Sequence, residues 1–105
     1  MQSNFSNKGT ISTLGTVIVE CDTRTRKLVK MMRFRNPSVY EIYIDVYDAY
    51  TSSTVRITDL LLGAGDMLIE EEEIYLEPGD KITVSSDISG TTFFITGEDI
   101  DLKKR

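Results

Sequence analysis

The chain has 105 residues and a formal net charge of −5, a size that suits one globular domain. It has no histidine, which removes the commonest general base and the usual catalytic zinc ligands, and its single cysteine, Cys21, permits no internal disulfide. No apolar run approaches the ~20 residues of a membrane-spanning helix, and residues 1–10 are too polar for a signal peptide. We therefore expect a protein that is not an enzyme, binds no metal or cofactor and has no membrane partner.

The charges are distributed unevenly along the chain. Residues 1–40 carry seven basic and two acidic side chains, whereas residues 41–100 carry two basic and fourteen acidic ones. Regions of opposite charge on one small domain favour contacts between copies of it. The alternative is that folding mixes these charges over the surface, and the sequence leaves both possibilities open.

Polar residues dominate the first part of the chain. Residues 1–12 are rich in Ser, Asn, Thr and Gly and predict a flexible N-terminal arm, because too little apolar surface is present to offset ordering. Strands are expected over residues 14–21 and 28–35. The second strand is basic and ends at Asn36-Pro37, since proline has no N–H for a ladder and restricts the residue before it.

The clearest strand signal lies over residues 39–50. Apolar Tyr40, Ile42, Ile44 and Val46 alternate there with Glu41, Tyr43, Asp45 and Tyr47. This period of two predicts a strand with one face on the core and with Tyr43 and Tyr47 on the other face. A further strand is expected over residues 55–62, with a bulge or bend near Asp59, where the apolar parity changes.

The sequence pattern of residues 62–69 is repeated at residues 76–83. Each segment has an apolar strand end, a turn that ends in Gly-Asp and then a new strand. The turn residues are Gly65 and Asp66 in the first copy, and Pro78, Gly79 and Asp80 in the second. Glycine provides the positive φ of a type II turn and proline presets the position before it, so these residues are expected to be structural.

The whole pattern is one of short strands separated by turns. Later strands are expected over residues 82–84 and 91–96, and no helical period occurs anywhere. Seven or eight such strands predict an all-β fold, a single antiparallel β-sandwich or jelly roll, over residues 13–100. Residues 101–105 form a charged C-terminal tail.

Two charged segments could bind a ligand. The four glutamates Glu70, Glu71, Glu72 and Glu73 could hold a hard cation, but neighbours on a strand point to opposite faces. A charged edge that blocks stray strand pairing explains this run better. The basic residues include Arg24, Arg26, Arg33 and Arg35, yet they are not interleaved with aromatic residues, and the pI of about 4.6 argues against a nucleic-acid partner.

The segments 62–68 and 75–82 carry a family resemblance. Their sequences, Leu-Gly-Ala-Gly-Asp-Met-Leu and Tyr-Leu-Glu-Pro-Gly-Asp-Lys-Ile, follow a basic strand that ends in Asn-Pro and an alternating Val/Ile strand. This order over about residues 14–97 resembles small β-sandwich accessory structural proteins of tailed bacteriophage particles, which coat heads, complete necks or form parts of fibres. The resemblance implies no catalytic residues. The acidic run at residues 70–73 departs from it, because a strand there would usually alternate.

These observations together suggest a virion structural protein, for example a head decoration or head–neck subunit. Its expected partners are capsid, neck or tail proteins and its own copies, and its expected location is the virion. The candidate interface residues are Tyr43, Asp45, Tyr47, Arg24, Arg26, Arg33, Arg35 and Glu70 to Glu73. Two alternatives remain open, a carbohydrate-binding or adhesin module that uses the Tyr43/Tyr47 column as a platform, and a cytoplasmic β-sandwich inhibitor.

Overall fold

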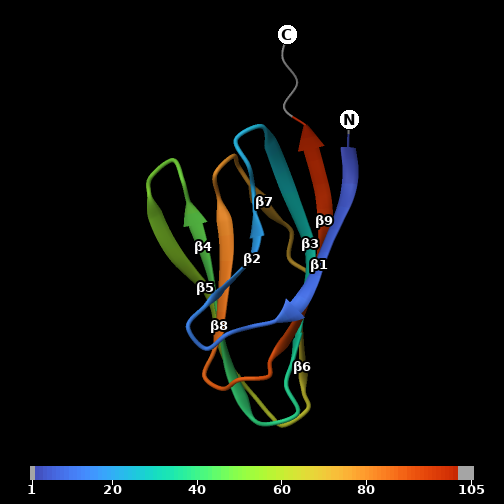
Figure 1. Cartoon of the computed structure of the whole chain (residues 1–105), viewed down its shortest axis with the longest axis vertical. Coiled ribbons are helices and arrows are strands. Elements are labelled where there is room, and N and C mark those ends of the chain that lie inside the picture. The colour runs from blue at the N-terminus through green and yellow to red at the C-terminus, as the bar shows by residue number, and fades with distance from the viewer. Residues whose placement is uncertain (1, 102–105) are drawn as a thin grey trace.

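The computed structural model describes residues 2–101 of the chain, and these residues form nine β-strands without a helix (Figure 1). In chain order the strands are β1 (Gln2–Thr10), β2 (Thr16–Glu20), β3 (Thr25–Arg35), β4 (Tyr40–Asp48), β5 (Ser53–Leu62), β6 (Met67–Glu70), β7 (Ile74–Leu76), β8 (Lys81–Ser86) and β9 (Thr92–Asp101). Strands dominate because Val, Ile, Tyr, Phe and Thr, which pack well on a pleated surface, recur between Gly-, Pro- and Asn-containing turns.

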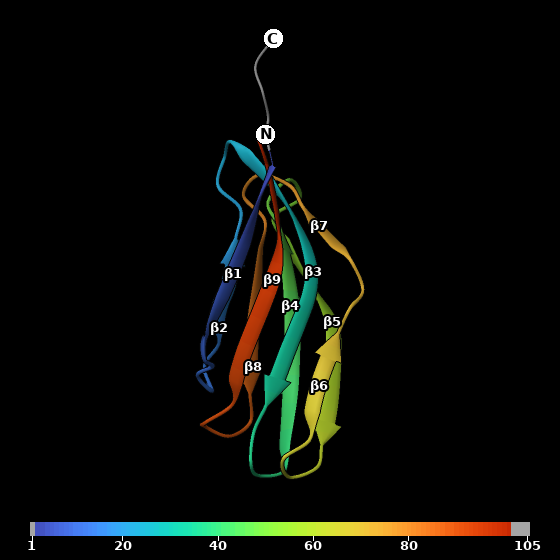
Figure 2. The same ribbon diagram turned by 90° about the vertical axis from the view of Figure 1, so that its right-hand side faces the viewer.

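The strands form two antiparallel sheets that pack face to face. Sheet A has the order β1-β9-β3-β6, with β7 also paired to β3, and sheet B has the order β2-β8-β4-β5. Figure 2 looks onto sheet A, with sheet B behind it. Because β6 and β7 pair with different parts of β3, they act as one interrupted strand, and the arrangement is that of a jelly roll. The prediction of an all-β antiparallel sandwich is confirmed.

The core lies between the two sheets. On β4 the alternating residues Tyr40, Ile42 and Ile44 are fully buried, as the period of two in the sequence predicts. The buried hydroxyl of Tyr40 lies 3.1 Å from the backbone carbonyl oxygen of Phe34 and 2.8 Å from that of Asp66. Burial of this aromatic side chain therefore leaves no polar atom without a partner.

A bulge in β3 changes which residues face the core. The pairing of β3 with β9 shifts between Val29 and Met31, so Lys30 is an extra residue there. Val29 is fully buried on the core side together with Met32. Residues four apart on a regular strand share a face, but Leu28 and Met32 lie on opposite sides of β3, because the bulge reverses the parity.

Two further bulges lie in sheet B. The pairing of β2 with β8 shifts between Val17 and Val19, so the consecutive residues Ile18 and Val19 are both buried, whereas Val17 is exposed. In β5 the extra residue is Ile57, since Thr58 pairs with Ile44 and Arg56 with Asp45. The change of parity expected near Asp59 thus occurs two residues earlier.

The N-terminal segment differs from the expected flexible arm. Residues 2–10 form β1, which pairs along its whole length with β9, and Phe5 packs against the core. Backbone hydrogen bonds to a neighbouring strand need no apolar composition, so the polar sequence did not predict this strand. β9 likewise runs beyond the expected residues 91–96, because β1 and β3 pair with it on both sides. Of the expected tail over residues 101–105, residues 102–105 lie outside the described part of the chain.

Candidate interaction surfaces

The outer side of sheet B carries the predicted tyrosine column. Tyr43, Asp45 and Tyr47 project outward from β4, where they pair with Asp59, Arg56 and Thr54 of β5. The guanidinium of Arg56 donates to both carboxylate oxygens of Asp45, over 2.9 and 3.3 Å. We call this surface the acidic face; its acidic residues are Glu20, Glu41, Asp45 and Asp59.

Cations lie over both tyrosine rings of the acidic face. The guanidinium carbon of Arg56 is 4.9 Å from the ring centre of Tyr43, and the Lys81 ammonium is 5.4 Å from that of Tyr47. A sugar platform needs an open ring face, so these contacts disfavour the carbohydrate-binding alternative. A hydrogen bond with Glu41, partial removal from water and nearby carboxylates together raise the pKa of Tyr43 to about 12, so this phenol stays protonated.

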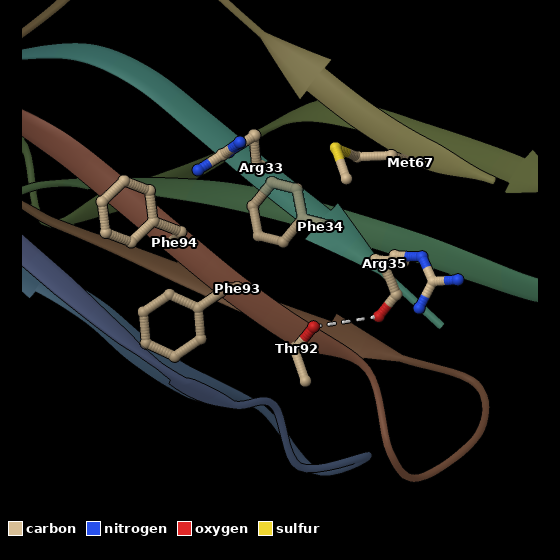
Figure 3. Close-up of a pocket in the computed structure, with 7 residues that line it drawn as sticks. All are labelled: Arg33, Phe34, Arg35, Met67, Thr92, Phe93 and Phe94. Atoms are coloured by element: carbon tan, nitrogen blue, oxygen red, sulfur yellow. Dashed lines mark hydrogen bonds between the residues drawn. The ribbon is translucent and has the colours of Figure 1, made fainter. Parts of the chain in front are cut away.

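The outer side of sheet A brings together basic and aromatic residues from several strands. Figure 3 shows Arg33 and Arg35 of β3, Phe94 of β9 and Met67 of β6. These residues line a shallow hollow of about 260 Å³. Lys8 of β1 lies directly opposite Phe94 in the register. We call this surface, defined by Lys8, Arg33, Arg35 and Phe94, the basic face.

The two arginines of the basic face are available for a partner. The guanidinium of Arg33 lies 5.1 Å from the ring centre of Phe94, and both arginines are exposed. Within residues 2–101 neither Arg33 nor Arg35 forms an ion pair. Arginine beside an aromatic ring on an exposed surface is a typical composition of protein interfaces.

The other predicted basic residues lie elsewhere. Arg26 pairs with Glu77 over 2.9 Å, and Arg24 is exposed in the turn between β2 and β3, where its backbone N–H donates to Asp22. Lys30, at the bulge of β3, pairs with Glu98 over 2.8 Å. The basic stretch of the sequence therefore does not form one continuous patch, and only Arg33 and Arg35 come together.

The acidic run interrupts the edge of sheet A. Glu70 ends β6 and is half-buried, whereas Glu71, Glu72 and Glu73 form the exposed connection to β7. Within the described part of the chain, no three Cys, Asp or Glu side chains converge on a point where a metal ion could sit. An unpaired acidic connection at this place limits strand addition to this edge.

The residues singled out as structural turns gather at the two ends of the sandwich. Asn36 is buried and donates through its side chain to the carbonyl oxygen of Ser89 (3.1 Å) and to the Thr91 hydroxyl (2.8 Å). Its carbonyl oxygen accepts from the N–H of Gly65, over 2.9 Å. Pro37 follows in the exposed part of the same turn. Asn36 thus joins three chain segments at one end of the molecule.

Both Gly-Asp turns have the same backbone geometry. Gly65 and Gly79 have φ values of 76° and 90°, and the following Asp66 and Asp80 donate N–H to residues 63 and 77, over 3.1 and 3.0 Å. Pro78 occupies the position before Gly79, as in a type II turn. The two aspartates differ, however, because Asp80 is buried and Asp66 is exposed.

One surface was not predicted from the sequence, the free edge of β5. β5 is the last strand of sheet B, and Val55, Ile57, Leu60 and Leu61 are all between 43% and 64% exposed. In the sequence, apolar residues occupy both odd-numbered and even-numbered positions over residues 55–62. A strand buried on one face only should alternate, so this double pattern indicates an additional apolar contact.

Comparisons with known proteins define the fold and no closer relationship. No protein-family model matches the sequence, and no curated protein matches it. Among the residues described, there is no helix that could cross a bilayer.

Three solved structures are similar to this chain over nearly its whole length. A Bacillus endospore appendage protein of disulfide-linked pili has a TM-score of 0.57 at 10% identity, and the match covers 98% of this chain and 88% of that one. The Drosophila NLP core, studied for pentamer formation and histone binding, gives 0.58 at 17% identity, with 94% and 99% covered. A protein of the Helicobacter pylori bacteriophage KHP30 capsid gives 0.57 at 9% identity, with 95% and 93% covered. The fold of this chain is therefore similar to that of viral capsid and pilus proteins.

Proposed function

We propose that this chain is a non-enzymatic structural subunit of a virus particle, which acts through protein–protein contacts of its two sheet faces. More specifically, we propose an accessory subunit of a tailed bacteriophage, located on the capsid or at the junction of head and neck. The observation that carries the proposal is that two exposed arginines, Arg33 and Arg35, lie beside Phe94 on the basic face and form no ion pair within residues 2–101.

The two outer faces support this role because their charges differ in sign. The basic face offers exposed arginines, and the opposite acidic face carries four carboxylates with two basic residues, Arg56 and Lys81. A rigid sandwich with opposite charges on its two sides can bind an acidic partner on one side and a basic partner on the other. The fold likeness to a bacteriophage capsid protein is consistent with such a role.

The proposal is tested on particles produced without the chain. Purified wild-type protein is added to particles from cells in which its gene has been deleted, and the particles are then isolated by sedimentation. We expect the protein to co-sediment, and immunogold electron microscopy should place it on the capsid or neck. A protein that stays entirely in the supernatant would overturn the proposal.

A matched pair of variants tests which face binds. Arg33→Glu reverses one charge on the basic face, and Arg24→Glu makes the same reversal in the exposed turn between β2 and β3. We expect Arg33→Glu to lower the affinity for particles by at least about tenfold, because a reversed charge at the centre of an interface repels its partner. Arg24→Glu should bind as the wild type does.

A further inference from the structure

The free edge of β5 is the longest apolar edge in the described part of the molecule. It presents ten residues, Ser53–Leu62, whose unpaired backbone groups face solvent beside four exposed apolar side chains. Exposed edges of this kind accept another strand, and soluble proteins usually protect them. β5 lies at the side of the sandwich where β6 also ends sheet A (Figure 2).

The other edges carry features that discourage strand addition. β1 is polar and carries Lys8, β2 has only five residues, and β6 and β7 are separated by Glu71 to Glu73. β5 has no proline, no glycine and only two charged residues, Arg56 and Asp59. These two charges are opposite in sign, so they can pair with each other across a symmetric contact.

The bulge at Ile57 determines which self-pairing keeps the two faces of the sheet intact. Arg56 and Asp59 both lie on the outer side, opposite Asp45 and Tyr43, because Ile57 and Thr58 together occupy one position of the pleat. Without the bulge, residues three apart would lie on opposite faces. Only with it can Arg56 of one copy stand opposite Asp59 of another on the same side of a continuous sheet.

We propose that β5 pairs antiparallel with β5 of a second copy of this chain, about a two-fold axis through the two bulges. Arg56 of each copy then lies opposite Asp59 of the other, Val55 opposite Leu60, and Thr54 opposite Leu61. The whole strand is used, because Ser53 pairs with Leu62. Sheet B of one copy continues into sheet B of the next. This inference rests on the proposed structural role and names one of the partners of that subunit.

The side chains brought together in this register suit each other. Val55 and Leu60, 57% and 44% exposed in the single chain, cover each other on the inner side. Arg56 already contacts Asp45 through two of its five N–H groups, so further donors remain for Asp59 of the second copy. No like charges face each other along the strand, and directly opposed apolar and opposite-charge pairs stabilise antiparallel sheets.

Cysteine cross-linking tests the register. One preparation carries Thr54→Cys and the other Leu61→Cys; both positions are exposed, and the native Cys21 is buried and does not interfere. Mixed under oxidising conditions, they should form a covalent dimer in at least about half of the chains. Neither variant alone should do so, because identical positions lie roughly 20 Å apart in this pairing.

Ser53→Cys mixed with Leu61→Cys is the matched control, since these residues point to opposite faces, and it should give little dimer. A dimer from Thr54→Cys alone, or equal yields from all mixtures, would overturn the proposal. Circular dichroism checks that each variant folds. A wild-type protein that remains a monomer by light scattering at high concentration would also overturn it.

The outcomes separate this inference from the proposed function. If the cysteines do not cross-link but the wild-type protein still binds particles, the pairing through β5 is wrong and the structural role stands. If they cross-link but the protein binds no particle, the pairing stands and the virion role falls.

Discussion

Asp80 is an acidic side chain that is almost completely buried, with 8% of its surface exposed. One carboxylate oxygen accepts from the N–H of Ala49 and the other from the N–H of Glu77, each over 2.9 Å. The side chain therefore ties the end of the β4 hairpin to the turn between β7 and β8. Hydrogen bonds from two backbone donors are the reason why a charged residue is tolerated at this depth.

Asp80→Ala should lower the free energy of unfolding by about 1–3 kcal/mol, because two backbone donors lose their acceptor. Asp66→Ala is the matched control, since Asp66 follows a glycine in the same kind of turn but is exposed, and its carboxylate accepts no hydrogen bond within residues 2–101. Its effect should stay within about 0.5 kcal/mol. Urea unfolding monitored by circular dichroism measures both. Equal losses would show that the buried hydrogen bonds of Asp80 are not what stabilises the turn.

At the scale of single residues, the sequence predicts turns better than contacts. Asn36-Pro37 and the two Gly-Asp turns follow from backbone conformations that only a few residue types adopt. The contact between Arg33 and Phe94 could not be predicted, because it depends on the register between β3 and β9. The cations over Tyr43 and Tyr47 could not be predicted from the sequence for the same reason, since Arg56 and Lys81 come from two different neighbouring strands.

At the scale of elements, strand prediction depended on the local pattern. β4 could be predicted because its alternation is strict, with one face on the core and one outward. β1 could not be, because its polar residues are ordered by backbone pairing with β9, which is far away in the sequence. The bulge at Lys30 could not be placed either. It adds one residue to β3 and so exchanges the faces of the strand on either side of it.

Gly97 of β9 lies where β9 packs tightly against both of its neighbours, β1 and β3. A Cβ atom there would lie 2.1 Å from the backbone carbonyl oxygen of Leu28 on β3 and 2.6 Å from the Phe5 ring on β1. Gly97→Ala should therefore destabilise the fold by about 3 kcal/mol or more, because a backbone atom cannot yield as a side chain can. Thermal unfolding should show a clear drop in Tm.

Gly9→Ala is the control for this substitution. Its Cβ would meet only the Phe93 ring, at 3.2 Å, so the fall in Tm should be much smaller. Adding Phe5→Ala to Gly97→Ala removes the aromatic clash but leaves the carbonyl oxygen of Leu28 in place, and stability should not return. A double variant as stable as Phe5→Ala alone would contradict this explanation.

At the scale of the whole molecule, folding sorts the charges of the sequence onto different surfaces. β1 and β3 carry six of the twelve basic residues and both belong to sheet A, whereas β4, with three acidic side chains and no basic one, belongs to sheet B. The uneven distribution of charge along the chain thus remains in part as a difference in charge between the two outer faces. It is weakened by ion pairs such as Lys27–Asp99 and Lys30–Glu98, which join the basic strand β3 to β9.

Two kinds of contact between copies should therefore respond differently to salt. Contacts between a basic and an acidic face depend on exposed charges, which are screened beyond about 10 Å at 0.1 M salt and beyond about 3 Å at 1 M. Pairing along β5 depends mainly on backbone hydrogen bonds and on apolar residues such as Val55 and Leu60, which salt does not screen. Light scattering at rising salt should show larger assemblies that dissociate to dimers, but no further.

Arg33→Glu separates these contributions within one protein. It reverses an exposed charge on the basic face, which belongs to sheet A, whereas β5 belongs to sheet B. The substitution should therefore remove the salt-sensitive assemblies and leave the dimer unchanged. The same mass distribution for Arg33→Glu and the wild type at low salt would mean that the basic face takes no part in contacts between copies. The exposed Arg33 and Arg35 would then bind a different protein, and particle binding would be the remaining test of that face.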